Sequence, residues 1–585
     1  MTRSLVAAAL GLILTALPQA QPSSGVDDFF EAFTADWIAF NPNQATATRF
    51  FSGERQRQLE RQMTPQTPEW RRQRVALAQQ GLATLGTFDR TRMGEAQRLS
   101  ADVMAWQLDA VVRSEQYADY YFPFEQMNGV NVGLVSALTV SHPVAEPADA
   151  ESYLARLGQV PARMDESLAE ARRLADAGLI PPRFILRSTT DQMRQFVAPP
   201  AARNPFVTVL AERMAMAGIP ETRREALRAA AEALVAGEIY PAWRQVIAFL
   251  ETLIARASDQ AGLWRFARGA EAYADALRTF TTTSLTADEI HDIGLREVAR
   301  LEGEMESVLA QLGRREGSLQ ARIEQLEKDL GYPLTDEGRK AIMTDVERFV
   351  RDAEARAAVQ FTRRPKAPVV ALPYPRFREA NAAASYSSPS PDGSRPGTFQ
   401  IPLRPERMTR FGLRTLVYHE TVPGHHFQIA LEMENPATPR FRRIRALGGI
   451  SVLSEGWGLY AERLAAESGW YDGDLEGRLG QLDGALFRAR RLVVDTGIHA
   501  RRWTRQQAID YGIEASEVER YVVYPGQACA YMIGQLKLVE LRERARYTLG
   551  DRFSIRDFHD VVLATGTVPL DLLERQVDAY IRATP

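Results

Sequence analysis

The sequence predicts a mainly α-helical protein with one small β-sheet. Three long segments, 221–256, 286–329 and 336–359, carry apolar residues at spacings of three and four with charged residues between them. This spacing is typical of amphipathic helices. Few stretches alternate in the manner of strands. The exception is 384–403, where a turn-rich stretch of Ser, Pro, Asp and Gly is followed by a short extended run.

The N-terminus has the pattern of a signal peptide. Arg3 precedes an apolar run from Leu5 to Leu17, and Ala20 is a small residue suited to cleavage. The run is too short to span a bilayer comfortably, and no cysteine follows it for lipid attachment. We therefore expect an exported protein, periplasmic or secreted, that loses residues 1–20 and has no membrane association afterwards.

Composition and charge narrow the class of protein. The chain has 585 residues, of which 45% are hydrophobic and 25% charged, with a formal net charge of -3. This is the composition of an ordinary globular protein. The small net charge produces no strong electrostatic field that would attract nucleic acid. Cys529 is the single cysteine, so no intramolecular disulfide can form. We expect an N-terminal helical region over 21–280 and a catalytic helical region over 281–585; the sequence does not indicate an oligomeric state.

A cluster of histidines carries the chemistry. Three of the seven histidines, His419, His425 and His426, lie within eight residues, and Glu420 follows the first. A neutral imidazole can bind zinc while a neighbouring carboxylate acts as general base. On an unbroken helix His425 would lie about 120° round from His419 and His426 about 10 Å along the axis. Pro423–Gly424 disfavours a continuous helix across this segment. We therefore expect a break that brings His425, or alternatively His426, back toward His419 as the second metal ligand.

The third ligand is expected from the downstream segment 454–462. Glu455 is the candidate, because metallopeptidases of the Glu-ligand type take a carboxylate from a following helix. Glu462 is seven residues further on and shares the helix face. It is therefore expected to orient a histidine ligand, or else to be a solvated charge.

Four further residues are candidates for catalysis or binding. Asp495 and His499 are four residues apart on one helix face, so they either form a structural pair or face the cleft. The hydroxyl of Tyr531 could stabilise an oxyanion, as could His499 or the histidine not bound to metal. Arg542 lies three helical turns after Tyr531 and would bind a substrate carboxylate or remain on the surface.

The extended run Gly397–Leu403 lies just upstream of the histidines. A strand at a sheet edge beside the metal helix could hold an extended peptide by backbone pairing. The alternative is a surface hairpin without substrate contact.

Together these motifs resemble a bacterial family catalogued as domain of unknown function 885. The resemblance covers most of the chain after the leader, most tightly 280–585. It implies a large helical metallopeptidase-like body, similar to the carboxypeptidase Taq and thimet oligopeptidase types, with a deep cleft. It also implies a small β-sheet edge beside the zinc helix. Arg395, in the upstream strand motif, and Gln527 become substrate-binding candidates through it.

The expected activity is zinc-dependent hydrolysis of a peptide or small amide, with one Zn²⁺ per chain. His419, His425 and Glu455 hold the metal, and Glu420 takes a proton from the attacking water. Two alternatives stay open: a hydrolase of a non-peptide amide or ester, and a non-catalytic periplasmic binding protein. The presence of Glu420 beside His419 argues against the second, because binding zinc requires no adjacent base.

Overall fold

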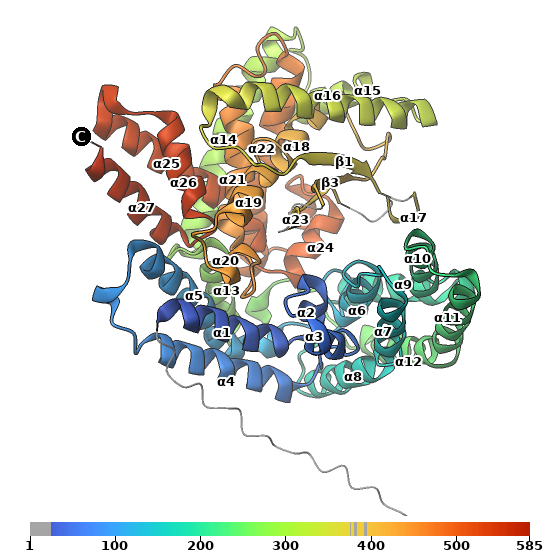
Figure 1. The fold of residues 1–585 in the computed structure, drawn as a ribbon. Coiled ribbons are helices and arrows are strands. Elements are labelled where there is room, and N and C mark those ends of the chain that lie inside the picture. Colours follow the sequence, from blue (N-terminus) through green and yellow to red (C-terminus); the bar gives the residue numbers. More distant parts are fainter. Residues whose placement is uncertain (1–24, 375, 380–382, 391–394, 585) are drawn as a thin grey trace, which may run out of the picture.

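The structure is a computed structural model, and it describes residues 25–374, 376–379, 383–390 and 395–584. This part of the chain is mainly helical and contains one three-stranded sheet, which confirms the predicted fold class (Figure 1). The predicted signal peptide, residues 1–20, lies outside the described residues. No helix in the described ranges is both long enough and apolar enough to cross a membrane.

The helices of the first half are mostly short. Their bounds are α1 (Val26–Ala39), α2 (Pro42–Thr48), α3 (Gly53–Glu60), α4 (Pro68–Leu85), α5 (Glu95–Ser114), α6 (Val130–Thr139), α7 (Pro147–Leu157), α8 (Val160–Asp176), α9 (Arg183–Val197), α10 (Pro205–Met216), α11 (Glu221–Leu234), α12 (Tyr240–Ile254) and α13 (Gly269–Thr281).

The second half contains the longest helices. Their bounds are α14 (Ala287–Gln311), α15 (Leu319–Asp329), α16 (Asp336–Gln360), α17 (Arg376–Glu379), α18 (Arg410–Glu420), α19 (His425–Glu434), α20 (Arg440–Arg443), α21 (Ser451–Glu467), α22 (Leu475–His499), α23 (Arg505–Asp510), α24 (Ala515–Val523), α25 (Ala530–Leu549), α26 (Ile555–Thr565) and α27 (Leu570–Ala583).

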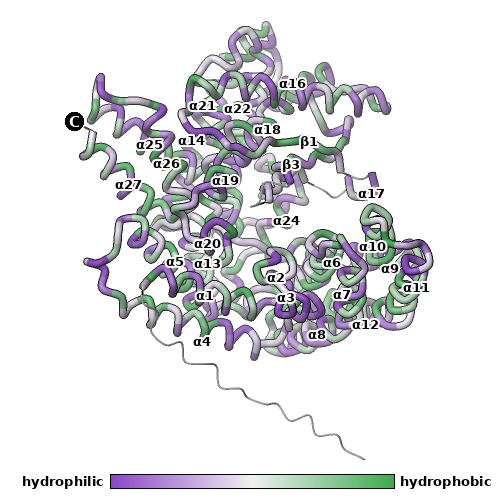
Figure 2. The backbone as a smooth tube through the Cα atoms, viewed as in Figure 1, coloured by the Kyte–Doolittle hydropathy of each residue, from purple (hydrophilic) through white to green (hydrophobic). Residues whose placement is uncertain are grey.

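The three long segments predicted as helices are helical. Segment 221–256 forms α11 and α12, joined by one π-helical turn at Val235–Ile239. Segment 286–329 is divided into α14 and α15, because Gly313 and Gly317 both adopt positive φ between them. Segment 336–359 is α16. Along these helices hydrophilic and hydrophobic residues alternate in short runs (Figure 2).

Two large hydrophobic cores hold the helices together. Helices α6 to α12 lie side by side at the lower right of Figure 1 and share a core around Phe206 and Trp243. Helices α1 and α5 instead share a core with α21, α22 and α25, which contains Trp37 and Trp457. The helices of the first half therefore take part in both cores. The division into 21–280 and 281–585 stays a prediction.

The sheet has the order β1–β3–β2. β1 (Val369–Pro373) runs parallel to β3 (Gly397–Ile401), and β2 (Ser385–Ser387) runs antiparallel to it. β3 is therefore paired on both sides, and the expectation that Gly397–Leu403 forms a free edge is wrong. The sheet edge beside the cleft is β2 instead, because 383–386 line the cleft.

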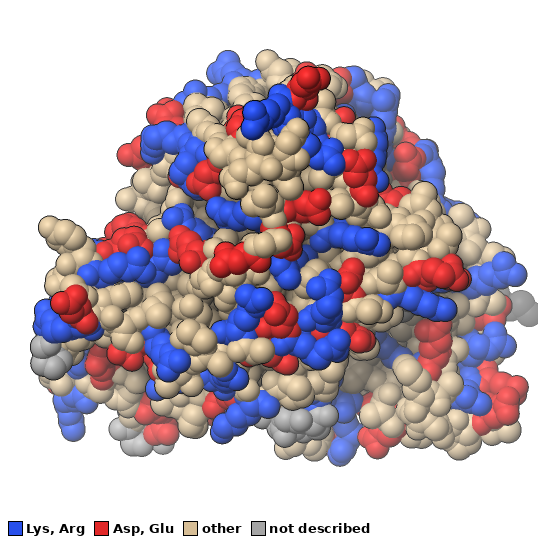
Figure 3. All heavy atoms as spheres, turned by 90° about the horizontal axis from the view of Figure 1, so that it is seen from above, with Lys and Arg blue, Asp and Glu red and all other residues tan. Residues whose placement is uncertain are grey.

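The surface mixes charges of both signs. Figure 3 shows Lys and Arg interspersed with Asp and Glu over the face seen from above. Many of the arginines form ion pairs along a helix or between neighbouring helices, such as Arg300 with Glu297 and Glu304. Positive and negative side chains are thus mixed on the face shown, in keeping with the small net charge of -3.

Candidate metal centre

The break between α18 and α19 sets the geometry of the centre. α18 begins after Thr409, which caps it, and ends at Glu420. At Gly424 the chain folds back so closely that a Cβ atom would collide with the carbonyl oxygens of Tyr418 and His419. The carbonyl of Pro423 accepts a hydrogen bond of 2.8 Å from the Trp457 indole. Glycine is required at this close approach, and the fold-back places the start of α19 beside the end of α18.

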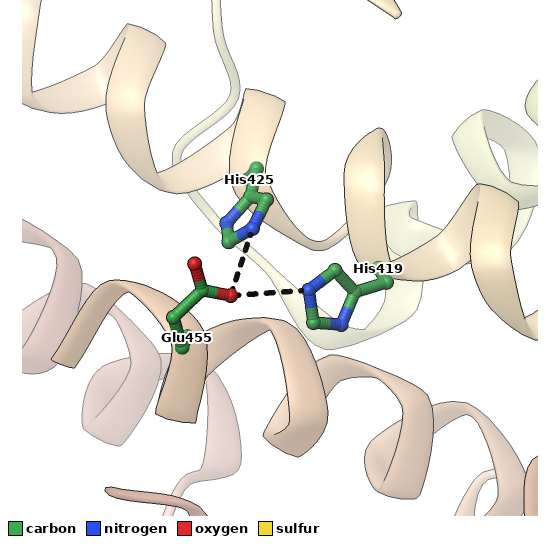
Figure 4. A group of neighbouring side chains, drawn as sticks. All are labelled: His419, His425 and Glu455. Carbon is green, nitrogen blue, oxygen red and sulfur yellow. Dashed lines mark ion pairs between the residues drawn. The ribbon is translucent and has the colours of Figure 1, made fainter. Parts of the chain in front are cut away.

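His419, His425 and Glu455 come together at this break (Figure 4). Oε2 of Glu455 lies 3.5 Å from Nε2 of His419 and 3.4 Å from Nε2 of His425. The two imidazole rings are nearly perpendicular, with centroids 4.7 Å apart. One potential ligand atom from each residue lies within 4.8 Å of the other two. The structure thus gathers the three residues named as ligands from the sequence.

Two of the separations between these atoms match those of ligand atoms around a zinc ion. Ligand atoms bound tetrahedrally at about 2.0–2.1 Å from zinc are separated by about 3.3 Å. Both distances to Glu455 are close to that separation. Two imidazoles and one carboxylate are a common donor set at catalytic zinc sites, where a fourth position stays open for water or substrate.

Glu462 holds the other side of the His419 ring. Its Oε1 lies 2.7 Å from Nδ1 of His419, and its Oε2 accepts a hydrogen bond from the Thr415 hydroxyl. α21 can pass this close because residue 458 is glycine, where a Cβ atom would lie 2.5 Å from the His419 ring. The carboxylate thus directs the Nδ1 proton to itself and leaves Nε2 facing Glu455.

The electrostatics of the centre are dominated by its carboxylates. Burial by itself would lower the pKa of His419, but hydrogen bonds with Glu455 and Glu462 raise it to about 10. Burial acts to raise the pKa of Glu455, yet its hydrogen bonds with His419 and His425 hold the pKa well below the ordinary value. The centre therefore favours positive charge between these groups.

Glu420, the predicted base, is the last residue of α18 and is 7% exposed. Its Oε2 is buried and has no hydrogen-bond partner among the described residues. It lines a cleft of about 440 Å³ together with the three candidate ligands. A buried carboxylate oxygen without a partner costs free energy, so this atom has hydrogen-bonding capacity that the described residues leave unused.

His426 does not lie in the cleft. Its ring is buried, and Nδ1 lies 2.9 Å from the hydroxyl of Tyr386 on β2. Because α19 begins at His425, consecutive side chains point in different directions, and only the first returns to the metal. The expected role of His426 in charge stabilisation is therefore corrected: His426 supports the strand that carries Tyr386 to the cleft.

His499 and Asp495 also lie away from the cleft. Both ring nitrogens of His499 bind backbone: Nδ1 accepts from Leu263 N–H, and Nε2 donates to the Tyr521 carbonyl. Asp495 accepts from the Tyr273 hydroxyl at 2.6 Å and from a backbone N–H. Burial raises the pKa of Asp495 to about 7. The C-terminal turns of α22 are buried on all sides, which corrects both site predictions.

Tyr531 and Gln527 lie at the cleft wall or directly behind it. Tyr531 lines the cleft, and its ring centroid is 4.6 Å from the guanidinium carbon of Arg491. Gln527 does not line the cleft, but its Oε1 accepts a bond of 2.6 Å from Arg520, which does. The predicted substrate contact of Gln527 is therefore replaced by a contact to a cleft residue.

Arg542 and Arg395 are not at the cleft. Arg542 is buried between carboxylates, at 2.6 Å from Glu467 and 2.9 Å from Glu543. Arg395 is exposed, and its backbone N–H donates to the Ser390 hydroxyl. Neither side chain lines the cleft, so the structure does not support their assignment as substrate-binding residues.

Several cleft residues were not singled out from the sequence. They are Tyr386, Arg445, Arg488, Arg491, Glu517 and Arg520. The three-residue spacing of Arg488 and Arg491 was a detectable signal, since it places both on one helix face. Arginine is common throughout this sequence, however, and no other feature set these positions apart.

Comparison with known proteins places the chain in a family. The model of a family described as "Bacterial protein of unknown function (DUF885)" matches residues 42–577. The chain belongs to this DUF885 family. Among curated proteins, no match was found.

Two solved structures share the fold of this DUF885 protein. One, described as "the putative lipoprotein from Colwellia psychrerythraea", is 31% identical with a TM-score of 0.89; the match covers 95% of this chain and 98% of that one. The other is described as "a putative lipoprotein of unknown function from Shewanella oneidensis". It is 18% identical with a TM-score of 0.70 over 94% of this chain and 99% of that one, and it shows the fold alone.

Proposed function

We propose that this DUF885 protein is a zinc-dependent hydrolase that cleaves peptide bonds of short peptides. The observation that carries the proposal is the convergence of His419, His425 and Glu455 beside the unpartnered Oε2 of Glu420. All four residues line one cleft, so a metal and a base would meet the same substrate. A cavity of about 440 Å³ suits a short peptide better than a folded chain.

Each residue has a defined part in the proposed reaction. Zinc held by the three ligands would polarise the substrate carbonyl and lower the pKa of water. Glu420 accepts the proton of the attacking water at Oε2 and passes it to the leaving amine. Tyr531, on the cleft wall, donates its hydroxyl proton in a hydrogen bond to the developing oxyanion. Glu462 keeps the proton of His419 on Nδ1.

Export is part of the proposal. Residues 1–20 have the pattern of a signal peptide. The relative from Colwellia psychrerythraea is described as a "putative lipoprotein", and lipoproteins are exported. Expression in a bacterial host, followed by fractionation and N-terminal sequencing of the mature chain, tests this part.

The activity is tested with wild-type protein and the Glu420→Gln variant. Both are loaded with zinc, and metal content is measured by mass spectrometry. A panel of short peptides, non-peptide amides and esters is then offered with and without a chelator. We expect chelator-sensitive peptide hydrolysis by the wild type, and equal zinc content with a rate at least about 100-fold lower in Glu420→Gln.

The remaining outcomes discriminate between the alternatives. Hydrolysis confined to esters or non-peptide amides would assign the same centre to another substrate class. Zinc binding without turnover of any substrate would indicate a binding protein. Unchanged peptide hydrolysis in Glu420→Gln would reject the assigned base.

A further inference from the structure

Part of the cleft wall carries arginines that the proposed hydrolysis does not use. Arg488 and Arg491 come from α22 and Arg520 comes from α24, and all three line the cleft that contains the metal ligands. We propose that these arginines bind the free C-terminal carboxylate of the peptide substrate, an inference that rests on the proposed peptidase function. The protein would then act at the C-terminal end of short peptides.

The unpaired guanidinium group of Arg488 is the main support for this proposal. Its Nη1 donates to the carbonyl of Gly484, one turn earlier in its own helix, and its Nε is buried without a partner. Among the described residues no carboxylate accepts a hydrogen bond from it, and Asp483 attracts it only electrostatically. A guanidinium group in a protein wall is usually paired, because leaving a charge partly buried and uncompensated is costly. A substrate anion would supply the missing partner.

Arg488 also lies close to the metal centre. The open side of Gly484 faces both Nη1 of Arg488 and Oε2 of Glu462, at 3.3 and 3.5 Å from the position that a Cβ atom would occupy. Glu462 is itself bonded to His419. An anion held by Arg488 would therefore lie within a short peptide's length of the candidate zinc ion.

Arg491 and Arg520 share a single carboxylate. Glu517 lies 2.8 Å from Arg491 and 3.5 Å from Arg520. The Arg491 side chain is 5% exposed, yet its Nη1 has no partner among the described residues, and the same holds for Nε of Arg520. Arg491 and Arg520 thus share one carboxylate, and Arg488 has only the electrostatic attraction of Asp483, so this part of the wall retains a positive excess.

The two inner guanidinium groups are held rigidly. Arg491 donates from Nε to the Tyr521 hydroxyl at 3.1 Å, and its guanidinium carbon lies 4.6 Å from the centroid of the Tyr531 ring. Arg520 donates to Gln527 at 2.6 Å. Fixed guanidinium forks recognise planar carboxylates through paired hydrogen bonds, which ammonium groups cannot reproduce. The wall is thus preorganised for a carboxylate.

The C-terminal carboxylate is the favoured source because every unmodified peptide carries it, whatever its sequence. A cavity of this size accepts the end of a chain more readily than its middle. An acidic side chain near the scissile bond offers the same chemistry, so the test must separate the two sources.

The test uses three N-acetylated peptides that differ only at the last residue: a free acid, its C-terminal amide, and an amide whose last residue is glutamate. With zinc-loaded wild type we expect kcat/KM to be about 10- to 100-fold higher for the free acid than for the amide. We expect the glutamate amide to behave like the plain amide. A glutamate amide as good as the free acid would overturn the C-terminal assignment.

The variant Arg488→Gln tests the arginine directly. It should lower kcat/KM for the free acid by about 10- to 100-fold and leave the amide unchanged. Arg488→Lys should recover part of the loss, which also shows that the site remains folded. The matched control is Arg490→Gln on the same helix, because Arg490 pairs with Glu302 and does not line the cleft. Equal losses for acid and amide in Arg488→Gln would overturn the proposal.

A binding experiment separates this inference from the proposed activity. Calorimetry with zinc-loaded Glu420→Gln protein measures the Kd of the free acid and of the amide without turnover. We expect the free acid to bind at least about 10-fold more tightly than the amide. This difference should disappear in the double variant that carries both Glu420→Gln and Arg488→Gln. If no peptide is hydrolysed but this preference holds, the carboxylate site stands and the peptidase function fails. A preference that persists without Arg488 would show that another group binds the carboxylate, and it would overturn the site centred on Arg488.

Discussion

Oε1 of Glu462 lies 2.7 Å from Nδ1 of His419, on the opposite side of the ring from the Glu455 carboxylate. This contact joins two residues 43 positions apart in sequence. The Thr415 hydroxyl donates to the other carboxylate oxygen, so Glu462 cannot rotate freely. The orientation of a candidate zinc ligand therefore depends on a side chain outside the candidate ligand set.

We predict that Glu462→Gln weakens zinc binding by about 10- to 100-fold, because the neutral amide no longer fixes the tautomer and basicity of His419. A competition titration with a chromophoric chelator measures the affinity. Glu467→Gln is the control, since Glu467 lies on the same helix but pairs with Arg542. Equal zinc affinity in both variants would contradict the role given to Glu462.

The two adjacent histidines are predicted to behave differently. His425→Ala should lose most of its zinc, because Nε2 of His425 faces the Glu455 carboxylate. His426→Ala should retain zinc, since its ring is directed to Tyr386 instead. Metal analysis of the purified variants decides between them, and zinc lost from His426→Ala alone would reverse the assignment.

Gly424→Ala should disrupt the fold-back between α18 and α19. The added Cβ atom would collide with the carbonyl oxygens of Tyr418 and His419. We expect a loss of about 1–3 kcal/mol in stability, together with reduced zinc content. Urea unfolding followed by circular dichroism measures the change.

The matched substitution is Gly303→Ala. Gly303 lies within α14, where a Cβ atom would meet nothing within 4 Å. Alanine there should raise stability by about 0.5–1 kcal/mol, since glycine is unfavourable in a helix interior. If both variants unfold alike, the close approach at Gly424 is not what sets the break.

His559 is predicted to make the protein sensitive to acid. Burial lowers its pKa to about 4, and the neutral ring donates to the Gln360 carbonyl while accepting from the Tyr460 hydroxyl. As the pH falls below the ordinary value of about 6.5, the unfolded chain gains a proton that the folded chain resists until about pH 4. Stability contributed by neutral His559 is therefore present near neutral pH and lost as the pH falls.

The variant His559→Gln isolates this effect. It should be less stable than wild type at pH 7.5, because two buried hydrogen bonds are disturbed. The difference in melting temperature should shrink between pH 6.5 and pH 5. Zinc release at low pH affects both proteins alike. A constant difference across this range would contradict a neutral buried imidazole.

Much of the fold and half of the site could be read from local sequence. Periodicity located the long helices, since one face of each must be apolar to pack. The metal-binding motif is local, because His419, Glu420 and Pro423–Gly424 lie within a few residues of one another. The sequence therefore showed both the residue types suited to a metal site and the need for a break in the helix. Glu455 was chosen because metallopeptidases of the Glu-ligand type take a carboxylate from a following helix, and Glu462 followed from its spacing of seven from Glu455.

Other features depended on contacts between distant segments. Asp495 and His499 carry residue types suited to a site, but their helix end is buried against α13 and the segment before α25, so their polar atoms are bonded there. The strand at Gly397–Ile401 was recognisable, whereas its central position depended on two partners from elsewhere. Periodicity shows which face of a helix or strand is apolar, but it does not identify the segment that packs against that face.

By itself, then, the sequence determined the helical class, the residues able to bind a metal, and the place where the metal helix must break. Only the tertiary structure decided that His425 returns to the centre while His426 supports β2. It also decided that arginines from α22 and α24 line the same cleft. The physical reason is that bond geometry and periodicity act over a few residues, whereas the direction of a side chain into a shared cavity is fixed by how separate helices pack.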